Sequence, residues 1–224
     1  MENNYDAVTD QAVYNGGNYK QGGYFTTFSG VKINPLDPEA WKLMNVKDIA
    51  HASSNICRFG GHCNKFYPLA QHCVLVSYMC DPEDALAGLL HDGSEAYISD
   101  IVRPVKETEM FEFYRKIESK LEWDVVKRFG LKEPMPKSVK EADMEVVVWE
   151  AKNLFNPTPK WVSDYMEVHP PCRLINLLNA SKELEDSFLF PFNCWQPAIA
   201  KAKYMKRFLE LSGVSLDNPY KDTQ

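Results

Sequence analysis

Residues 89–100 read LLHDGSEAYISD and place functional side chains where an apolar run ends. His91 and Asp92 stand side by side at the end of that run, and Glu95 and Asp100 follow. A buried ionised carboxylate costs several kcal/mol unless a cation or a metal ion compensates it. The stretch therefore predicts that the end of this helix binds something, instead of serving only as a packing surface.

The composition is that of an ordinary globular chain. The 224 residues are 45% hydrophobic and 25% charged, which suits one domain with short appendages. No apolar stretch is long enough to cross a membrane, and the first ten residues, MENNYDAVTD, do not resemble a signal peptide. We therefore expect a soluble cytoplasmic protein with no membrane partner.

The formal net charge of −6 argues against stable binding to nucleic acid through a broad basic face. A small polyanion remains compatible with it if a few Lys and Arg side chains converge in a pocket. The six cysteines contain no CxxC pair and are expected to be reduced and mostly buried. A zinc site built from Cys57, His62, Cys63 and Cys73 is the alternative, but this spacing fits no zinc finger or ribbon.

Hydrophobic periodicity predicts a mainly α fold with a short β-hairpin near the N-terminus. Residues 24–36 alternate weakly around Ser29-Gly30 and predict the hairpin. Asn45 is typical of a helix N-cap, Pro68 of a helix start, and Gly130 of a helix end. Helices are predicted over residues 45–57, 68–80, 81–92, 107–129, 138–155 and 195–212, the last ending at Gly213.

The two ends of the chain and one internal segment lack such patterns. Residues 1–24 show no period and are expected to form a flexible arm. The proline-rich segment 150–193 is expected to be irregular with short helices. We find no repeat and no domain boundary, so residues 25–224 are predicted to form a single domain with a helical and irregular C-terminal extension.

Polar residues interrupt three of the predicted apolar helix faces. His72 lies inside PLAQHCVLVSYM, His91 and Asp92 end AGLLHD, and Asp143 precedes MEVVVW. Each residue alone has an ordinary explanation: a single histidine is usually a hydrogen-bonded core residue, and Asp143 near a helix start is favoured by the helix dipole. Together, two imidazoles and two carboxylates suit a divalent transition ion with open positions for water and substrate.

The ordered set His72, His91-Asp92 and Asp143 resembles the HD superfamily of metal-dependent phosphohydrolases. Residues 55–77, NICRFGGHCNKFYPLAQHCVLVS, resemble a segment of bacterial 5'-deoxynucleotidases and phage dATP triphosphohydrolases, and LLHDGSEAYISDIVRPVK resembles their HDxxE…D block. The resemblance covers about residues 30–150. It implies a helical bundle that binds Zn²⁺, Co²⁺ or Mn²⁺, with Mg²⁺ as the candidate for a second ion.

The resemblance also implies roles for the acidic residues that follow the His-Asp pair. Glu95 would handle a proton on the nucleophilic water or on the leaving oxygen, and Asp100 would lie near the water and the sugar. Adjacent helical positions point about 100° apart, so His91 and Asp92 cannot both face one ion from the middle of a helix. Gly93 is expected to let the helix end there and so relax that constraint.

The remaining implied roles concern the substrate. Arg58, Lys106 and Lys140 fall where the resembling enzymes place phosphate contacts, and Lys140 shares a helix face with Asp143 three residues later. Phe59 would lie under the sugar or the base, at a position where the bacterial enzymes carry Trp.

We expect, on this resemblance, a dATP triphosphohydrolase that releases deoxynucleoside and triphosphate, because two lysines beyond Arg58 are many for a monophosphate. The alternatives are a 5'-deoxynucleotidase acting on monophosphates, a more distant alarmone hydrolase, and an HD module that binds a nucleotide without turnover. The resemblance further implies a small-molecule deoxynucleotide partner, a homo-oligomer, and the cytoplasm of a bacterium or a phage-infected host.

Overall fold

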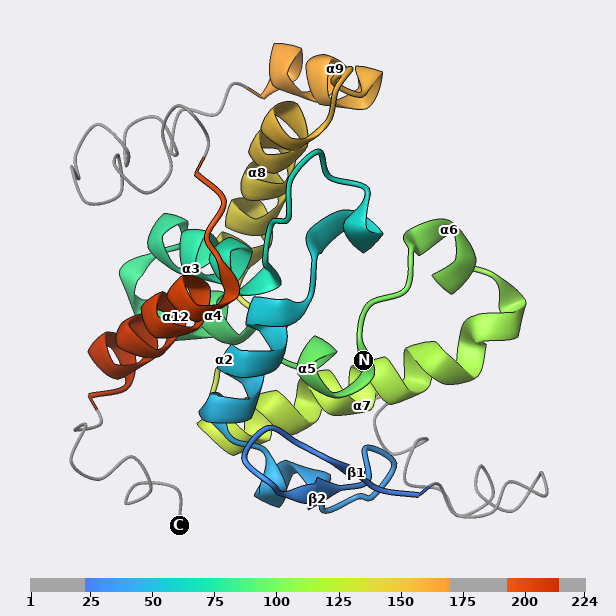
Figure 1. The fold of residues 1–224 in the computed structure, drawn as a ribbon, viewed down its shortest axis with the longest axis vertical. Coiled ribbons are helices and arrows are strands. Elements are labelled where there is room, and N and C mark those ends of the chain that lie inside the picture. Colours follow the sequence, from blue (N-terminus) through green and yellow to red (C-terminus); the bar gives the residue numbers. More distant parts are fainter. Residues whose placement is uncertain (1–22, 170–192, 214–224) are drawn as a thin grey trace.

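The computed structural model describes residues 23–169 and 193–213, and this part of the chain is mainly helical, as predicted (Figure 1). The elements, in chain order, are β1 (Phe25–Thr26), β2 (Lys32–Ile33), η1 (Ala40–Leu43), α2 (Val46–Asn55), η2 (Arg58–Gly61), α3 (Leu69–Met79), η3 (Pro82–Asp84), α4 (Ala85–Leu90), α5 (Glu95–Ile98), α6 (Arg103–Lys106), η4 (Glu109–Phe111), α7 (Glu112–Phe129), α8 (Lys137–Leu154), α9 (Lys160–Val168) and α12 (Pro197–Ser212).

The predicted hairpin is present, and a carboxylate of α2 binds its turn. Strands β1 and β2 pair antiparallel, with Phe25 opposite Ile33, and Gly30 adopts a φ of 84° in the turn. The backbone N–H and the hydroxyl of Ser29 donate to the two carboxylate oxygens of Asp48, at 2.7 and 2.8 Å. Asp48 thus fixes the hairpin against the first turn of α2.

The predicted helix boundaries agree with the structure at most ends. Asn45 caps α2 by accepting a hydrogen bond from the backbone N–H of Asp48, at 3.0 Å. Gly130 and Gly213 end α7 and α12 in the left-handed conformation, with φ of 63° and 67°. These helix ends are determined by the capping residues themselves, so they can be predicted from the sequence.

Two predicted helices differ from the structure. The helix predicted over 81–92 divides into η3 and α4 and ends at Leu90, and the one predicted over 107–129 begins as helix α7 only at Glu112. Thr108 is extended, with φ −72° and ψ 155°, and this separates α6 from η4. In the segment 150–193, α8 ends at Leu154, next to the predicted end at residue 155, and α9 is one of the short helices expected there. Residues 170–192, like the predicted arm over 1–22, lie outside the described residues.

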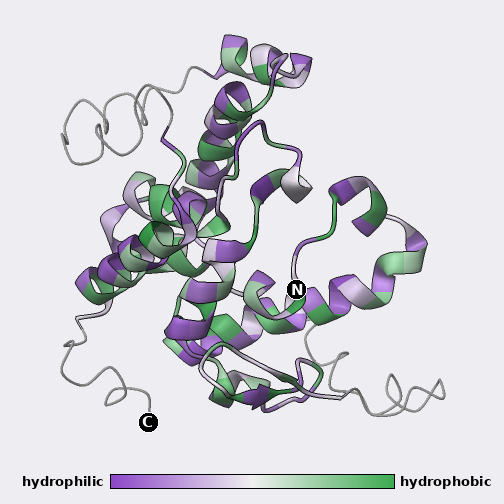
Figure 2. Ribbon diagram, in the orientation of Figure 1, coloured by the Kyte–Doolittle hydropathy of each residue, from purple (hydrophilic) through white to green (hydrophobic). Residues whose placement is uncertain are grey.

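Helix α3 is the centre of the fold. Nearly all of its side chains are buried, including His72 and Gln71, and it packs against α2, α4, α8 and α12. A helix that is apolar all round must be enclosed by others, since it has no face to offer to water. In Figure 2, by contrast, α7 and α12 alternate between hydrophilic and hydrophobic colour, as helices with one buried face do.

No helix in residues 23–169 or 193–213 combines the length and hydrophobicity that a membrane span requires.

Helices α3 and α4 approach each other closely at Gly88. A Cβ atom placed on Gly88 would lie 2.7 Å from the Cys80 sulfur and 3.2 Å from the Cα of Ser77. The absence of a side chain therefore allows the close contact that brings the end of α4 next to the middle of α3.

Gly88→Ala should consequently destabilise the protein, although Ala normally stabilises a helix interior relative to Gly by about 1 kcal/mol. Overpacking costs about 1–3 kcal/mol, so once the propensity gain is subtracted the free energy of unfolding in urea should fall by up to about 2 kcal/mol. Gly23→Ala is the matched control, because no atom lies within 4 Å of the Cβ position of Gly23. Equal unfolding free energies for the two variants would contradict the close-packing argument.

Candidate metal centre

Four side chains from three helices converge at the centre of the bundle. His72 comes from α3, His91 and Asp92 follow directly after α4, and Asp143 comes from α8. The two Nε2 atoms of the histidines lie 3.3 Å apart. An Asp92 carboxylate oxygen lies 3.2 Å from His91 Nε2 and 3.7 Å from His72 Nε2. An Asp143 oxygen lies 3.1 Å from His72 Nε2 and 3.8 Å from His91 Nε2.

These separations fit the ligand sphere of a transition ion. Two ligand atoms about 2.1 Å from one ion stand roughly 3.0 Å apart at right angles and roughly 3.4 Å apart in a tetrahedron. The ligand atoms of His72, His91 and Asp92 lie within 4.8 Å of one another, and Asp143 approaches both imidazoles. Nitrogen from imidazole together with carboxylate oxygen is a donor set suited to Zn²⁺, Co²⁺ or Mn²⁺. The predicted ligands are thus brought together, and the donor set fits such an ion.

Both imidazoles are held so that Nε2 faces the centre. Nδ1 of His91 lies 2.8 Å from the carbonyl oxygen of Gly88, and Nδ1 of His72 lies 2.8 Å from Oε1 of Glu150. Each acceptor requires a proton on Nδ1, which leaves the Nε2 lone pair free for a metal. Gly88 therefore has two effects: it lets α4 pack closely on α3, and its carbonyl oxygen orients the ligand His91.

Glu150 is the functional residue that the sequence interpretation missed. It lies on α8 two turns after Asp143, its side chain is fully buried, and it contacts both His72 and Arg58. The signal was present in the sequence: a glutamate follows the apolar run VVVW on the helix face that already carries Asp143. A buried carboxylate at that position needs a cationic or hydrogen-bonding partner.

Arg58 is close to the ligands, as predicted, but it is already engaged. Its guanidinium lies 3.4 Å from Oε2 of Glu150 and 3.6 Å from Oδ2 of Asp92. Phe59, next to it, has a left-handed backbone with φ 56° and stacks edge-on against Phe155, with the ring centroids 5.1 Å apart. A non-glycine residue in this conformation is held there by its surroundings. The predicted contact of Phe59 with a sugar or base stays a prediction.

The predicted phosphate contact Lys106 lies in an ion-pair network outside the ligand cluster. Its ammonium group lies 2.8 Å from a carboxylate oxygen of Glu118 on α7 and 3.3 Å from one of Asp100. Asp100 is exposed, so the predicted second acidic group faces solvent and Lys106. The structure therefore ties Lys106 to two carboxylates, which reduces the charge that it can offer to a phosphate.

Gly93 has a different role from the one expected. The helix ends at Leu90, before Gly93, and Gly93 does not have a positive φ. A Cβ atom there would lie 3.0 Å from the carbonyl oxygen of Leu90 and 3.4 Å from a methyl group of Val125 on α7. Gly93 thus provides room for the turn that carries His91 and Asp92 to pack against α7.

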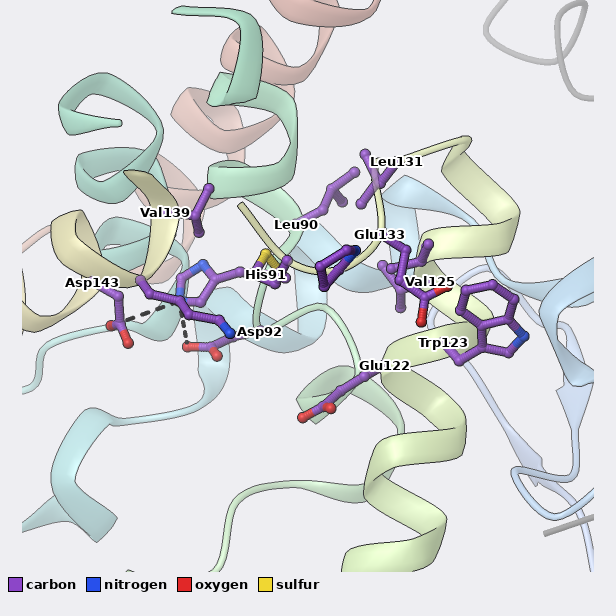
Figure 3. A pocket seen from close by; sticks show the side chains of 14 residues that line it. Leu90, His91, Asp92, Glu122, Trp123, Val125, Leu131, Glu133, Val139 and Asp143 are labelled. Atoms are coloured by element: carbon purple, nitrogen blue, oxygen red, sulfur yellow. Dashed lines mark ion pairs between the residues drawn. The ribbon is translucent and has the colours of Figure 1, made fainter. Parts of the chain in front are cut away.

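A pocket of about 390 Å³ opens beside the ligands (Figure 3). Figure 3 shows His91, Asp92 and Asp143 at one end and Trp123, Leu131 and Glu133 toward the other. The residues lining it are Leu90, His91, Asp92, Glu122, Trp123, Val125, Val126, Leu131, Glu133, Pro134, Met135, Val139, Lys140 and Asp143. Within the described chain, Lys140 is the one lysine or arginine that lines this pocket.

The carboxyl groups around the centre have widely separated pKa values. Burial, together with the charges of Asp92 and Asp100, raises the pKa of Glu95 to about 9. Burial acts to raise the pKa of Asp92 as well, but His91 and other cationic neighbours lower it to about 2. At neutral pH and without an ion, Glu95 is therefore a neutral acid beside an ionised ligand, which is an arrangement suited to proton transfer.

Comparison with known proteins identifies relatives but no activity. An uncharacterized protein of Escherichia coli (strain K12), YfdR, is 38% identical over 136 residues, which cover 58% of this chain and 72% of YfdR. The chain belongs to the YfdR family. The uncharacterized protein RCAP_rcc00048 of Rhodobacter capsulatus is 30% identical over 123 residues, 51% of this chain and 62% of that protein. No protein-family model matches the chain.

The raised pKa of Glu95 leads to a test on the metal-free protein. Between pH 4.5 and about 9 the unfolded state loses the Glu95 proton while the folded state keeps it, so stability falls as the pH rises through this window. Glu95→Gln cannot ionise and should raise the melting temperature by a few degrees, with a difference from wild type that grows from pH 5 to pH 9.

Glu141→Gln is the control for this comparison, because Glu141 is on α8 and forms a surface ion pair with Lys137. Melting curves in EDTA across this pH range give the measurement. A constant difference between Glu95→Gln and wild type would mean that the Glu95 pKa is not raised.

Proposed function

We propose that this protein is a metal-dependent phosphohydrolase that cleaves the 5'-phosphoester of a deoxynucleotide. The observation that carries the proposal is the convergence of two oriented Nε2 atoms and two carboxylates beside a pocket that His91, Asp92 and Asp143 line. A purely structural cluster would not need imidazoles with both Nε2 atoms aimed at a common point. The resemblance of the ordered residues to the HD superfamily supports the same reaction class.

The residues His72, His91, Asp92 and Asp143 would hold the ion. Bound there, a divalent transition ion would supply Lewis acidity toward a phosphate oxygen and toward a water nucleophile. Glu95, whose pKa is raised by burial to about 9 in the metal-free centre, would handle a proton on the nucleophilic water or on the departing 5'-oxygen. Lys140, on the pocket wall, would bind and orient the phosphate as negative charge shifts toward the leaving group.

The positions of the lysine and arginine side chains indicate how many phosphate groups the substrate carries. The expectation of a dATP substrate relied on Arg58, Lys106 and Lys140, yet Lys106 is paired with Asp100 and Glu118 outside the ligand cluster, which leaves Arg58 and Lys140 beside the candidate ligands. Glu122 and Glu133 line the pocket as well, and both would repel a polyphosphate chain. These charges favour the second candidate function, a 5'-deoxynucleotidase acting on monophosphates, over the triphosphohydrolase.

The reaction class is tested by incubating the protein with dAMP, dATP, AMP and ATP in Co²⁺ or Mn²⁺ and separating the products. We expect phosphoester cleavage that stops in EDTA and returns when the ion is restored. Glu95→Gln should lower kcat by about 10²–10⁴-fold while it keeps the bound ion, because Glu95 carries a proton and is not a ligand. Nucleotide binding without any product would instead support the non-catalytic module.

Substitution of Lys140 tests whether the substrate is a monophosphate or a triphosphate. A charge-assisted contact contributes about 1.5–3 kcal/mol, so Lys140→Ala should lower kcat/KM by roughly 10- to 150-fold for every substrate whose phosphate it contacts. Similar losses for dAMP and dATP would place Lys140 at the phosphate next to the sugar and support the monophosphatase. A loss confined to dATP would support the triphosphohydrolase.

Lys137→Ala is the matched control, since Lys137 is exposed one turn earlier on α8 and does not line the pocket. Its kcat/KM should remain within a factor of two or so of wild type on both substrates.

A further inference from the structure

Glu150 contacts the candidate ligand His72 and the guanidinium group of Arg58 at the same time. Its Oε1 lies 2.8 Å from Nδ1 of His72, and its Oε2 lies 3.4 Å from both Nε and Nη2 of Arg58. The glutamate side chain has no exposed surface, and only 14% of the Arg58 side chain is exposed. Residues that are distant in sequence thus meet in one enclosed chain of polar contacts.

We propose that Glu150 is a positioning residue that sets two affinities of the site, one for the ion through His72 and one for the anionic substrate through Arg58. This inference rests on the proposed metal-dependent function. Neither effect requires Glu150 to touch the ion or the substrate, since the carboxylate acts only through the two side chains that it holds.

The first half of the inference concerns His72. Because Oε1 accepts a hydrogen bond from the Nδ1–H, the tautomer that presents a bare Nε2 to the ion is favoured. Neither side chain has exposed surface, so in the intact protein the carboxylate, and not bulk water, accepts from this Nδ1. Changes to such partners of metal-binding histidines typically cost 10- to 100-fold in metal affinity.

The second half concerns Arg58. A guanidinium presents several N–H donors in a planar fork, and here Nε and Nη2 are directed at Glu150 while Nη1 lies 3.6 Å from the ligand Asp92. The fork is therefore fixed with one edge on Glu150, and Nη1 is left beside the metal ligands. A phosphate bound to an ion at this centre would lie within reach of Nη1, and no flexible side chain would have to be ordered to bind it.

An amide at position 150 cannot perform both tasks. If a glutamine turned its oxygen toward His72, its NH₂ group would face the N–H donors of Arg58. If it turned its oxygen toward Arg58, its NH₂ group would face Nδ1 and favour the other histidine tautomer, which carries a proton on Nε2. Only a carboxylate supplies two acceptors, one on each side, and this makes Glu150→Gln an informative substitution of nearly equal size.

The test measures binding, with no need for turnover. Co²⁺ affinity is determined by competition with a chromophoric chelator, and inorganic phosphate affinity by calorimetry on protein saturated with Co²⁺. Glu150→Gln should weaken at least one of the two affinities by 10- to 100-fold, and Glu150→Ala should weaken both. Arg58→Met should weaken phosphate binding and should not weaken Co²⁺ binding, because His72 keeps its acceptor.

The double variant Arg58→Met/Glu150→Ala separates positioning from general damage. If Glu150 acts on phosphate through Arg58, then adding Glu150→Ala to Arg58→Met should leave phosphate affinity unchanged and should still weaken Co²⁺ binding. Glu141→Gln, on the same helix but in a surface ion pair, is the control and should alter neither affinity.

The outcomes are distinct. A Glu150→Ala protein that unfolds at a lower temperature but binds Co²⁺ and phosphate like wild type would reduce Glu150 to a structural role and overturn the inference. A phosphate loss that persists in full without Arg58 would also overturn it. If no nucleotide is hydrolysed while both affinities change as expected, the proposed reaction fails and the role of Glu150 stands.

Discussion

The structure depends on neutralising charge inside an apolar bundle. Helix α3 has almost no exposed surface, yet it carries His72 at its middle, and α8 carries the fully buried Glu150 opposite it. Unpaired, each of these groups would cost several kcal/mol. The hydrogen bond between them, the nearby guanidinium of Arg58 and the ligand cluster satisfy one another. The packing of α3 against α4 and α8 is therefore also the condition under which the polar centre is stable.

Much of the fold was predictable because helix ends are determined locally. Asn45 accepts the hydrogen bond that a cap must accept, and Gly130 adopts the left-handed conformation that ends a helix. The four candidate ligands were predictable for a related reason: polar residues on otherwise apolar faces need a shared partner. The structure brings these four side chains within a few ångströms of one another, whereas the reaction that they serve stays a proposal.

What could not be predicted depends on neighbours that are distant in sequence. Lys106 lies in the basic stretch RPVK and was expected at a phosphate, but its partner Glu118 comes from the next long helix and lies 2.8 Å away. Gly93 was expected to end a helix, but its role is set by Val125 on α7. The pairing of Glu150 with Arg58 joins positions separated by 92 residues. No local rule specifies such contacts, and only the packed arrangement of the helices creates them.

The same balance of charge would couple the binding of an ion to the release of protons from the two imidazoles. Burial acts to lower the pKa values of His72 and His91, but the surrounding carboxylates raise both, which favours protonated imidazoles in the metal-free centre. Binding an ion requires bare Nε2 atoms, and those protons must therefore leave. If an ion binds at this candidate centre, its affinity should rise with pH until the imidazoles are neutral. Such an ion would also stabilise the folded state, because the unfolded chain has no comparable arrangement of ligands. Folding, ion binding and proton release would then be linked, and the buried carboxylate of Glu150 would act on this linkage through His72.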